Sequence, residues 1–200
     1  MAAGLSARST VLVRALFRYL RQTGLPYGLQ TVADVLRRAP QITARLIALF
    51  DARHDPALGA GRQAAMDAAE AEIESGLAAV AALEDDRILR LYRAVIRAIL
   101  RTNMFAPAGA EALAFKLDSA QVPGLPDPKP WREIFVYSPR VEGIHLRAGP
   151  VARGGLRWSD RRDDFRTEIL GLMKAQRVKN AVIVPTGAKG GFYPKQLPNP

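Results

Sequence analysis

The spacing of apolar residues changes near residue 110, and this change limits the possible folds more than any other feature of the sequence. Before it, apolar residues recur every three or four positions, as Leu12 and Leu16 do, which is typical of an amphipathic helix. After it come short runs of β-forming residues, the clearest of them at 133–137 and 141–146. The sequence therefore predicts a mixed α and β fold, with an all-helical N-terminal region followed by a partial α/β domain.

This change divides the chain into three predicted segments. We expect residues 1–105 to be helical, with the last helix ending at Asn103. We interpret residues 106–131 as a linker with one short strand, because four prolines within 119–130 leave no helical period there. Residues 132–200 then form the partial α/β domain.

The composition excludes several classes of protein. The chain has no cysteine, which excludes a disulfide scaffold, a cysteine nucleophile and an iron–sulfur centre. Neither histidine has a second histidine at metal-ligand spacing, so no metal site is expected. No stretch approaches the roughly 18 uncharged apolar residues of a membrane span. The net charge is +10, but no basic run stands out, so we expect a cytoplasmic protein without a nucleic-acid or membrane partner.

One glycine motif imitates a dinucleotide-binding loop. Residues 59–64 have the spacing Gly-x-Gly-x-x-Ala. Such a loop needs a buried strand before it and an acidic residue about 20 positions later, at the end of a second strand. The sequence predicts neither, so we interpret this motif as a loop before a helix.

A glycine-rich loop around Lys189 is the strongest candidate for a site. We expect a helix at 162–178, then a short buried strand at 182–184 that runs directly into the loop at 187–191. A lysine at the end of a strand lies where α/β proteins bind ligands, and glycines allow the backbone to approach a ligand closely. The spacing differs from that of a Walker A loop. A solvated lysine in a surface loop is the alternative.

Two further groups of cations and glycines precede that loop. Arg153 stands directly before Gly154 and Gly155, and Lys179 follows Gln176 at the end of the predicted helix. A pocket for a dicarboxylate needs several cations, because each carboxylate requires a charge-assisted donor. The alternative is that arginines in this region pair with acidic residues on the surface.

Several runs of the sequence carry a resemblance to one family. They are Ala152–Arg162, Thr167–Glu168, Lys179–Pro185 and Gly187–Gly191 and, further upstream, Asp85–Arg90, Arg101–Asn103 and Glu133–Gly143. These runs resemble the glutamate dehydrogenases, above all the very large bacterial NAD-specific class. The resemblance extends over roughly residues 10–198, and residues 150–198 look like the substrate-binding segment.

The resemblance implies a role for each candidate residue. Lys189 matches the family's catalytic lysine. Lys179, with Gln176 three positions before it, matches the lysine that binds the α-carboxylate of the substrate. Arg153 stands before the Gly-Gly step, where the compact hexameric enzymes have a lysine that contacts the side-chain carboxylate. The charge is the same, but the reach and geometry differ.

The resemblance also implies an activity, the oxidative deamination of L-glutamate to 2-oxoglutarate and ammonia, with NAD accepting a hydride from Cα. The NAD-binding domain and a catalytic aspartate are expected outside these 200 residues. The chain would then be an internal piece or a truncated product that is inactive alone, and the full enzyme a homo-oligomer. The alternatives are a non-catalytic helical interaction module with a degenerate ligand-binding tail, and a nucleic-acid binder, which would need a contiguous basic face.

Overall fold

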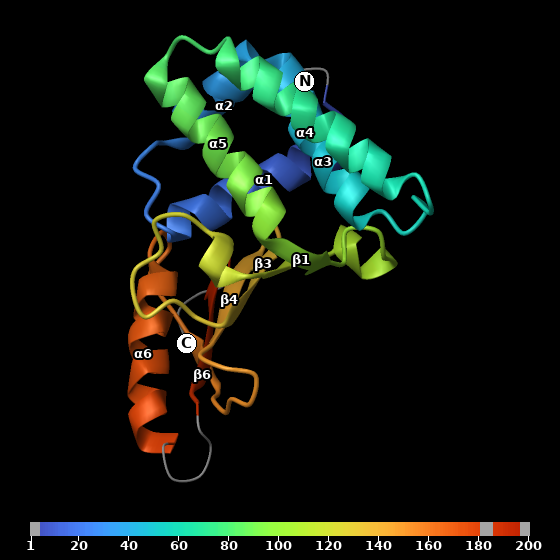
Figure 1. The fold of residues 1–200 in the computed structure, drawn as a ribbon. Helices are drawn as coiled ribbons and strands as arrows, with labels where there is room; N and C mark the ends of the chain where they lie inside the picture. Colours follow the sequence, from blue (N-terminus) through green and yellow to red (C-terminus); the bar gives the residue numbers. More distant parts are fainter. Residues whose placement is uncertain (1–4, 181–185, 197–200) are drawn as a thin grey trace. The chain divides into compact units, whose positions relative to one another are not determined.

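The computed structural model of the chain divides into two compact units, drawn in Figure 1. The helical unit consists of Met1–Phe17 and Pro26–Arg97, and the sheet unit consists of Arg18–Leu25 and Ala98–Pro200. The structure describes residues 5–180 and 186–196, and for 177–180 it describes the backbone alone. The strand predicted at 182–184 lies outside the described residues.

Amphipathic helices form the helical unit. They are α1 (Ala7–Gln22, of which Ala7–Phe17 belong to this unit), α2 (Leu29–Arg38), α3 (Pro40–His54), α4 (Arg62–Ala78) and α5 (Leu83–Ala98). Pro40 begins α3, where its fixed φ suits the first turn and its missing N–H is not needed. The apolar stripes bury side chains such as Leu16, Leu46 and Tyr92. The predicted helical N-terminal region is confirmed.

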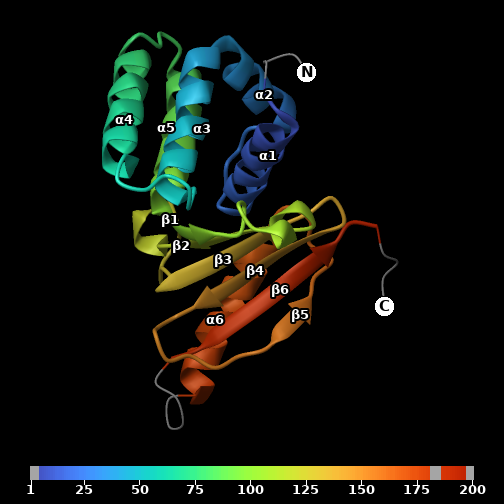
Figure 2. The ribbon, with the colours of Figure 1, turned by 90° about the vertical axis from the view of Figure 1, so that its right-hand side faces the viewer.

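A mixed sheet of six described strands forms the other unit, and α6 (Phe165–Asn180) covers one of its faces, as Figure 2 shows. The strands are β1 (Ile99–Thr102), β2 (Leu113–Leu117), β3 (Arg132–Tyr137), β4 (Val141–Arg147), β5 (Leu156–Trp158) and β6 (Ala188–Pro194). Their order in the sheet is β1-β2-β3-β4-β6-β5, and each pair is antiparallel except the parallel pair of β5 and β6. The strands predicted at 133–137 and 141–146 are confirmed as β3 and β4.

The last helix of the N-terminal region ends earlier than predicted. Helix α5 ends at Ala98 rather than at Asn103, and residues 99–102 form β1. Ile99 and Leu100 continue the apolar spacing of α5, which is why the sequence favoured a longer helix. Their hydrogen-bonding partner is β2, which lies further along the chain, and local spacing does not reveal a partner at that distance.

The predicted glycine loop at 187–191 is also wrong, because residues 188–194 form β6, which lies between β4 and β5. The glycines serve the packing of the sheet. A Cβ added at Gly191 would lie only 2.3 Å from Cδ1 of Ile169. A glycine at this position therefore lets α6 pack directly on β6.

Two buried ion pairs hold the covered face of the sheet. Glu133 of β3 and Glu142 of β4 are fully buried. Arg166 Nε donates to Glu133 Oε2 at 2.8 Å, and Arg18 Nε donates to Glu142 Oε1 at 2.8 Å. Burial disfavours the charged guanidinium of Arg166, but the attraction and hydrogen bonds of Glu133 outweigh burial and raise the pKa of Arg166. This pair attaches the first turn of α6 to β3.

Replacing Arg166 with Met would leave the Glu133 carboxylate buried without its partner. We expect Arg166→Met to lower the free energy of unfolding by about 3–5 kcal/mol, measured by urea denaturation. The double variant Arg166→Met, Glu133→Met removes both charges and should recover most of that loss. Arg161→Met breaks the exposed pair with Asp164 and should cost less than about 1 kcal/mol. If the Arg166 variant were no less stable than this control, the buried pair would not anchor α6.

Candidate active site

Strand β6 places Lys189 on the covered face of the sheet. Lys189 pairs with Leu146 of β4, and Leu146 pairs in turn with Glu133 of β3. Residues paired directly across neighbouring strands point to the same face. Lys189 therefore lies on the face that α6 covers, and its side chain is half-buried. Its backbone is held within the sheet rather than in a loop.

The Gly-Gly step before β5 lies directly against Lys189. A Cβ added at Gly154 would lie 1.4 Å from the carbonyl oxygen of Ala188, a distance that no side chain allows. A Cβ added at Gly155 would lie 4.0 Å from Nζ of Lys189. The Ala188 N–H donates to the Arg153 carbonyl at 3.0 Å. The two glycines thus allow this segment to approach β6 at the position of the lysine.

Glu168 of α6 connects β5 to the helix. Arg157 Nε donates to Glu168 Oε1 and Ser159 Oγ donates to Glu168 Oε2, both at 2.6 Å. Between these two donors, Trp158 packs edge-on against Phe192, with ring centroids 5.5 Å apart. Glu168 lies in one of the runs that resemble the family, but the resemblance assigned it no role. The helix dipole alone explains a carboxylate in the first turn of a helix. The position of Glu168 in the sequence therefore does not reveal its contact with Arg157 and Ser159.

The remaining predicted contact residues lie on two different segments. Gln176 and Lys179 belong to α6; Gln176 is half-buried, and the side chain of Lys179 lies outside the described residues. Arg153 forms an isolated bridge with Gly187. The structure thus places the backbone of Arg153 beside the segment that leads to Lys189. The convergence of the Lys179 and Lys189 side chains stays a prediction.

His145 lies on the opposite face of the sheet. It pairs with Gly190, whose position alternates with that of Lys189 along β6. A Cβ added at Gly190 would lie 3.0 Å from His145 Cδ2 and 2.5 Å from Leu156 Cδ2. Burial, together with the charge of Arg147, lowers the pKa of His145. This histidine therefore belongs to the packing of the uncovered face and not to the candidate site.

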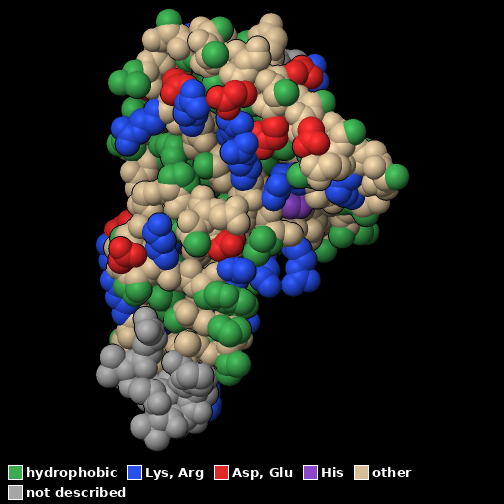
Figure 3. Space-filling model, in the orientation of Figure 1, with side chains coloured by type: hydrophobic (Ala, Val, Ile, Leu, Met, Phe, Trp, Pro, Cys, Tyr) green, Lys and Arg blue, Asp and Glu red, His purple; other side chains and the backbone are tan. Residues whose placement is uncertain are grey.

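Other kinds of site find little support in the described part of the chain. Residues 5–180 and 186–196 contain no group of three His, Asp or Glu side chains that could hold a metal ion. No helix described there is both long and apolar enough to cross a bilayer. The residues at 59–61 follow helix α3 and no described strand precedes them, so they do not fit a dinucleotide loop. On the face shown in Figure 3, Lys and Arg are interspersed with Asp and Glu over the helical unit.

Comparison with known proteins gives a consistent result. Residues 72–200 match the model of the bacterial NAD-glutamate dehydrogenase catalytic domain, and residues 1–56 match that of glutamate dehydrogenase helical motif 3. The chain is 52% identical over 206 residues to an NAD-specific glutamate dehydrogenase of Mycobacterium tuberculosis, with 100% of the chain and 13% of that protein covered. It is 51% identical over 200 residues to the enzyme of that name from Halomonas elongata, and the match covers 98% of the chain and 12% of that enzyme. For the enzyme of that name from Pseudomonas aeruginosa the identity is 49% over 205 residues, and the match covers 99% of the chain and 13% of that enzyme.

The Gly-Gly step offers a matched pair of substitutions. Gly154→Ala forces a methyl group into the Ala188 carbonyl, so we expect it to separate β5 from β6 and to lower the free energy of unfolding by about 1–3 kcal/mol or more. Gly155→Ala meets only the flexible end of Lys189 and should cost clearly less. Urea denaturation of both variants measures the difference. Equal costs for the two would contradict the close approach at Gly154.

Proposed function

Because the chain belongs to the family of the bacterial NAD-glutamate dehydrogenases, we propose that it supplies part of the substrate site of such an enzyme. The reaction converts L-glutamate, NAD and water to 2-oxoglutarate, ammonia and NADH. The chain spans 12–13% of the length of the curated relatives it matches, so other parts of the enzyme complete the site. The observation that carries the proposal is Lys189, held in β6 against the Gly-Gly step.

We assign the catalytic role to Lys189. A Cβ added at Gly155 would lie 4.0 Å from Nζ, in ordinary van der Waals contact, so Gly155 places no side chain of its own between the lysine nitrogen and a small substrate. After hydride loss from Cα, water adds to the iminium carbon and ammonia then leaves. The lysine acts as an amine base that accepts a proton from the attacking water. Once protonated, it stabilises negative charge that develops on the oxygen of that water, and it returns the proton to the nitrogen that leaves as ammonia.

We assign the two carboxylates of the substrate to Arg153 and Lys179, with Gln176 assisting. A dicarboxylate needs a charge-assisted donor at each end. Arg153 supports this assignment because its bridge partner Gly187 lies two residues before Lys189. The assignment of Lys179 rests on the family pattern, in which the lysine stands three positions after a glutamine, as Lys179 does after Gln176.

We propose that NAD is held outside this chain. The relatives carry the name NAD-specific glutamate dehydrogenase, but the residues at 59–61 do not fit a dinucleotide loop, since no described strand leads into them. The proposed contribution of this chain is therefore to substrate binding and proton transfer. By family membership, we further propose that the full enzyme is cytoplasmic and that it is a homo-oligomer. Sedimentation of the purified enzyme would test the oligomeric state.

The chain by itself should have no dehydrogenase activity, because no described part of it fits a dinucleotide site. Purified chain mixed with glutamate and NAD should produce no NADH above a buffer control, followed by absorbance. Production of NADH that disappears in the Lys189→Ala variant would overturn this expectation.

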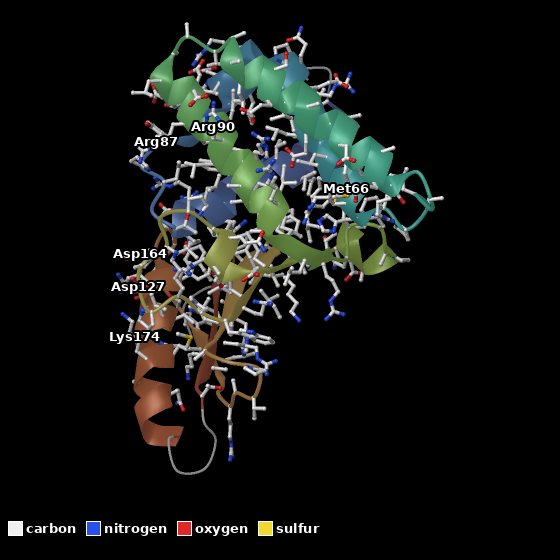
Figure 4. The ribbon with its side chains drawn as sticks, in the orientation of Figure 1. Met66, Arg87, Arg90, Asp127, Asp164 and Lys174 are labelled. Carbon is white, nitrogen blue, oxygen red and sulfur yellow. The ribbon has the colours of Figure 1, made fainter. Side chains whose placement is uncertain are left out.

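In a complete enzyme that contains this segment, Lys189→Ala should lower kcat by about 100-fold or more, as the loss of a positioned acid–base group does. Steady-state kinetics with glutamate measure the effect. Lys174→Ala is the matched control, because Lys174 lies exposed on α6 and points away from the sheet in Figure 4. A Lys189 variant with near-normal kcat would remove the catalytic assignment.

The two proposed carboxylate contacts should act mainly on substrate binding. Lys179→Met and Arg153→Met each remove a charged hydrogen bond of roughly 1.5–3 kcal/mol. We expect KM for glutamate to rise about ten- to a hundredfold in each variant, while Lys174→Met leaves it unchanged. An unaltered KM would place the substituted residue outside the substrate pocket.

A further inference from the structure

We propose that Glu168 is a positioning residue for Lys189. It holds β5, and with β5 the Gly-Gly step, at the correct distance from the lysine. The inference rests on the proposed function, in which Lys189 is the catalytic group.

Strand β5 has few attachments of its own. It consists of three residues at the edge of the sheet and, among the strands that the structure describes, pairs only with β6. The pairing is parallel, which is slightly less stable per residue than antiparallel pairing. Leu156 is 72% exposed, so it contributes little apolar burial. The side-chain contacts of β5 therefore matter more than they would for an inner strand.

Glu168 supplies the polar part of those contacts with both of its oxygens. Arg157 binds one oxygen and Ser159 binds the other, each at 2.6 Å. The Glu168 side chain is only 15% exposed, which limits competition from water. Hydrogen bonds to an ionised carboxylate are stronger than neutral ones, so one side chain holds both Arg157 of β5 and Ser159, which follows β5 by one residue.

The helix that carries Glu168 is itself firmly anchored. Two residues earlier, Arg166 forms the buried pair with Glu133. One residue later, Ile169 packs on Gly191 of β6. Glu168 thus stands between two packed residues and transfers the position of α6 to β5.

A loose β5 would change the surroundings of Lys189 directly. The step at Gly154 and Gly155 immediately precedes β5, and an added Cβ at Gly155 would lie 4.0 Å from Lys189 Nζ. An outward shift of β5 lengthens this separation and lets the lysine nitrogen move. A misplacement of about 1 Å at a reacting group can lower the rate by a factor on the order of 100.

Amide hydrogen exchange in the 200-residue chain tests the contact without reference to activity. The N–H groups of Ala188 and Gly190 donate to the carbonyls of Arg153 and Gly155, each at 3.0 Å. N–H groups alternate sides along a strand, so the intervening amide of Lys189 faces β4. In Glu168→Gln we expect the Ala188 and Gly190 amides to exchange about tenfold faster, while the Lys189 amide keeps its rate.

Two further variants make this result specific. Ser159→Ala should reproduce the pattern in weaker form and add little when combined with Glu168→Gln, because both act through the same contact. Asp164→Asn alters an exposed carboxylate just before α6, labelled in Figure 4, and should leave every β6 amide unchanged. Unchanged exchange at Ala188 and Gly190, or a uniform increase that includes β3 and β4, would overturn the proposal.

Kinetics in a complete enzyme test the connection to Lys189. We expect Glu168→Gln to lower kcat by a factor on the order of 10 to 100 in the parent enzyme. In a Lys189→Ala background the same substitution should have almost no further effect on kcat, because no lysine is left for Glu168 to position. A general structural defect would instead multiply the two losses, and that result would overturn the positioning role.

The two experiments separate this inference from the proposed function. If Lys189→Ala leaves kcat unchanged, the proposed function fails, and with it the positioning role, whatever the exchange pattern shows of the contact with β5. If Lys189 is essential but Glu168→Gln changes neither exchange nor kcat, the proposed function stands and the positioning role alone is rejected.

Discussion

Taking a carboxylate and a guanidinium out of water costs several kcal/mol per ion, and Glu133 and Arg166 are both almost completely buried. Each charge is therefore tolerable only in the position where it meets the other. This requirement fixes where the first turn of α6 lies on the sheet. Gln22 also helps to fix this position, since its side-chain oxygen accepts a hydrogen bond from the backbone N–H of Arg166 at 3.1 Å. The contacts of Glu168 and Ile169 follow from the same placement.

The candidate site is built as much by missing side chains as by those present. Gly154 allows one segment to touch the Ala188 carbonyl, and Gly191 allows α6 to touch β6. At Gly155 an added Cβ would already be in contact with Lys189 Nζ, 4.0 Å away. In this family member the glycines therefore allow close packing on both sides of β6, and this packing fixes the backbone that carries Lys189.

The sequence predicted most elements correctly but not their partners. The spacing of apolar residues was sufficient for the helices and for β3 and β4, because each of these signals lies within one element. It failed where two signals competed. Residues 99–102 continue a helical stripe yet pair with β2, and residues 188–191 are rich in glycine yet form part of β6. In both places hydrogen bonding with a distant strand decided the outcome.

The sequence by itself determined the family, the order of helical and sheet regions, and Lys189 as the residue of greatest interest, because these depend on residue types and local spacing. The tertiary structure alone decided that Lys189 belongs to an inner strand, that the Gly-Gly step lies against it, and that Glu168 holds β5 to α6. Those relations join residues that are far apart along the chain or lie on different elements. They arise from strand pairing and from the neutralisation of buried charge, which no local pattern records.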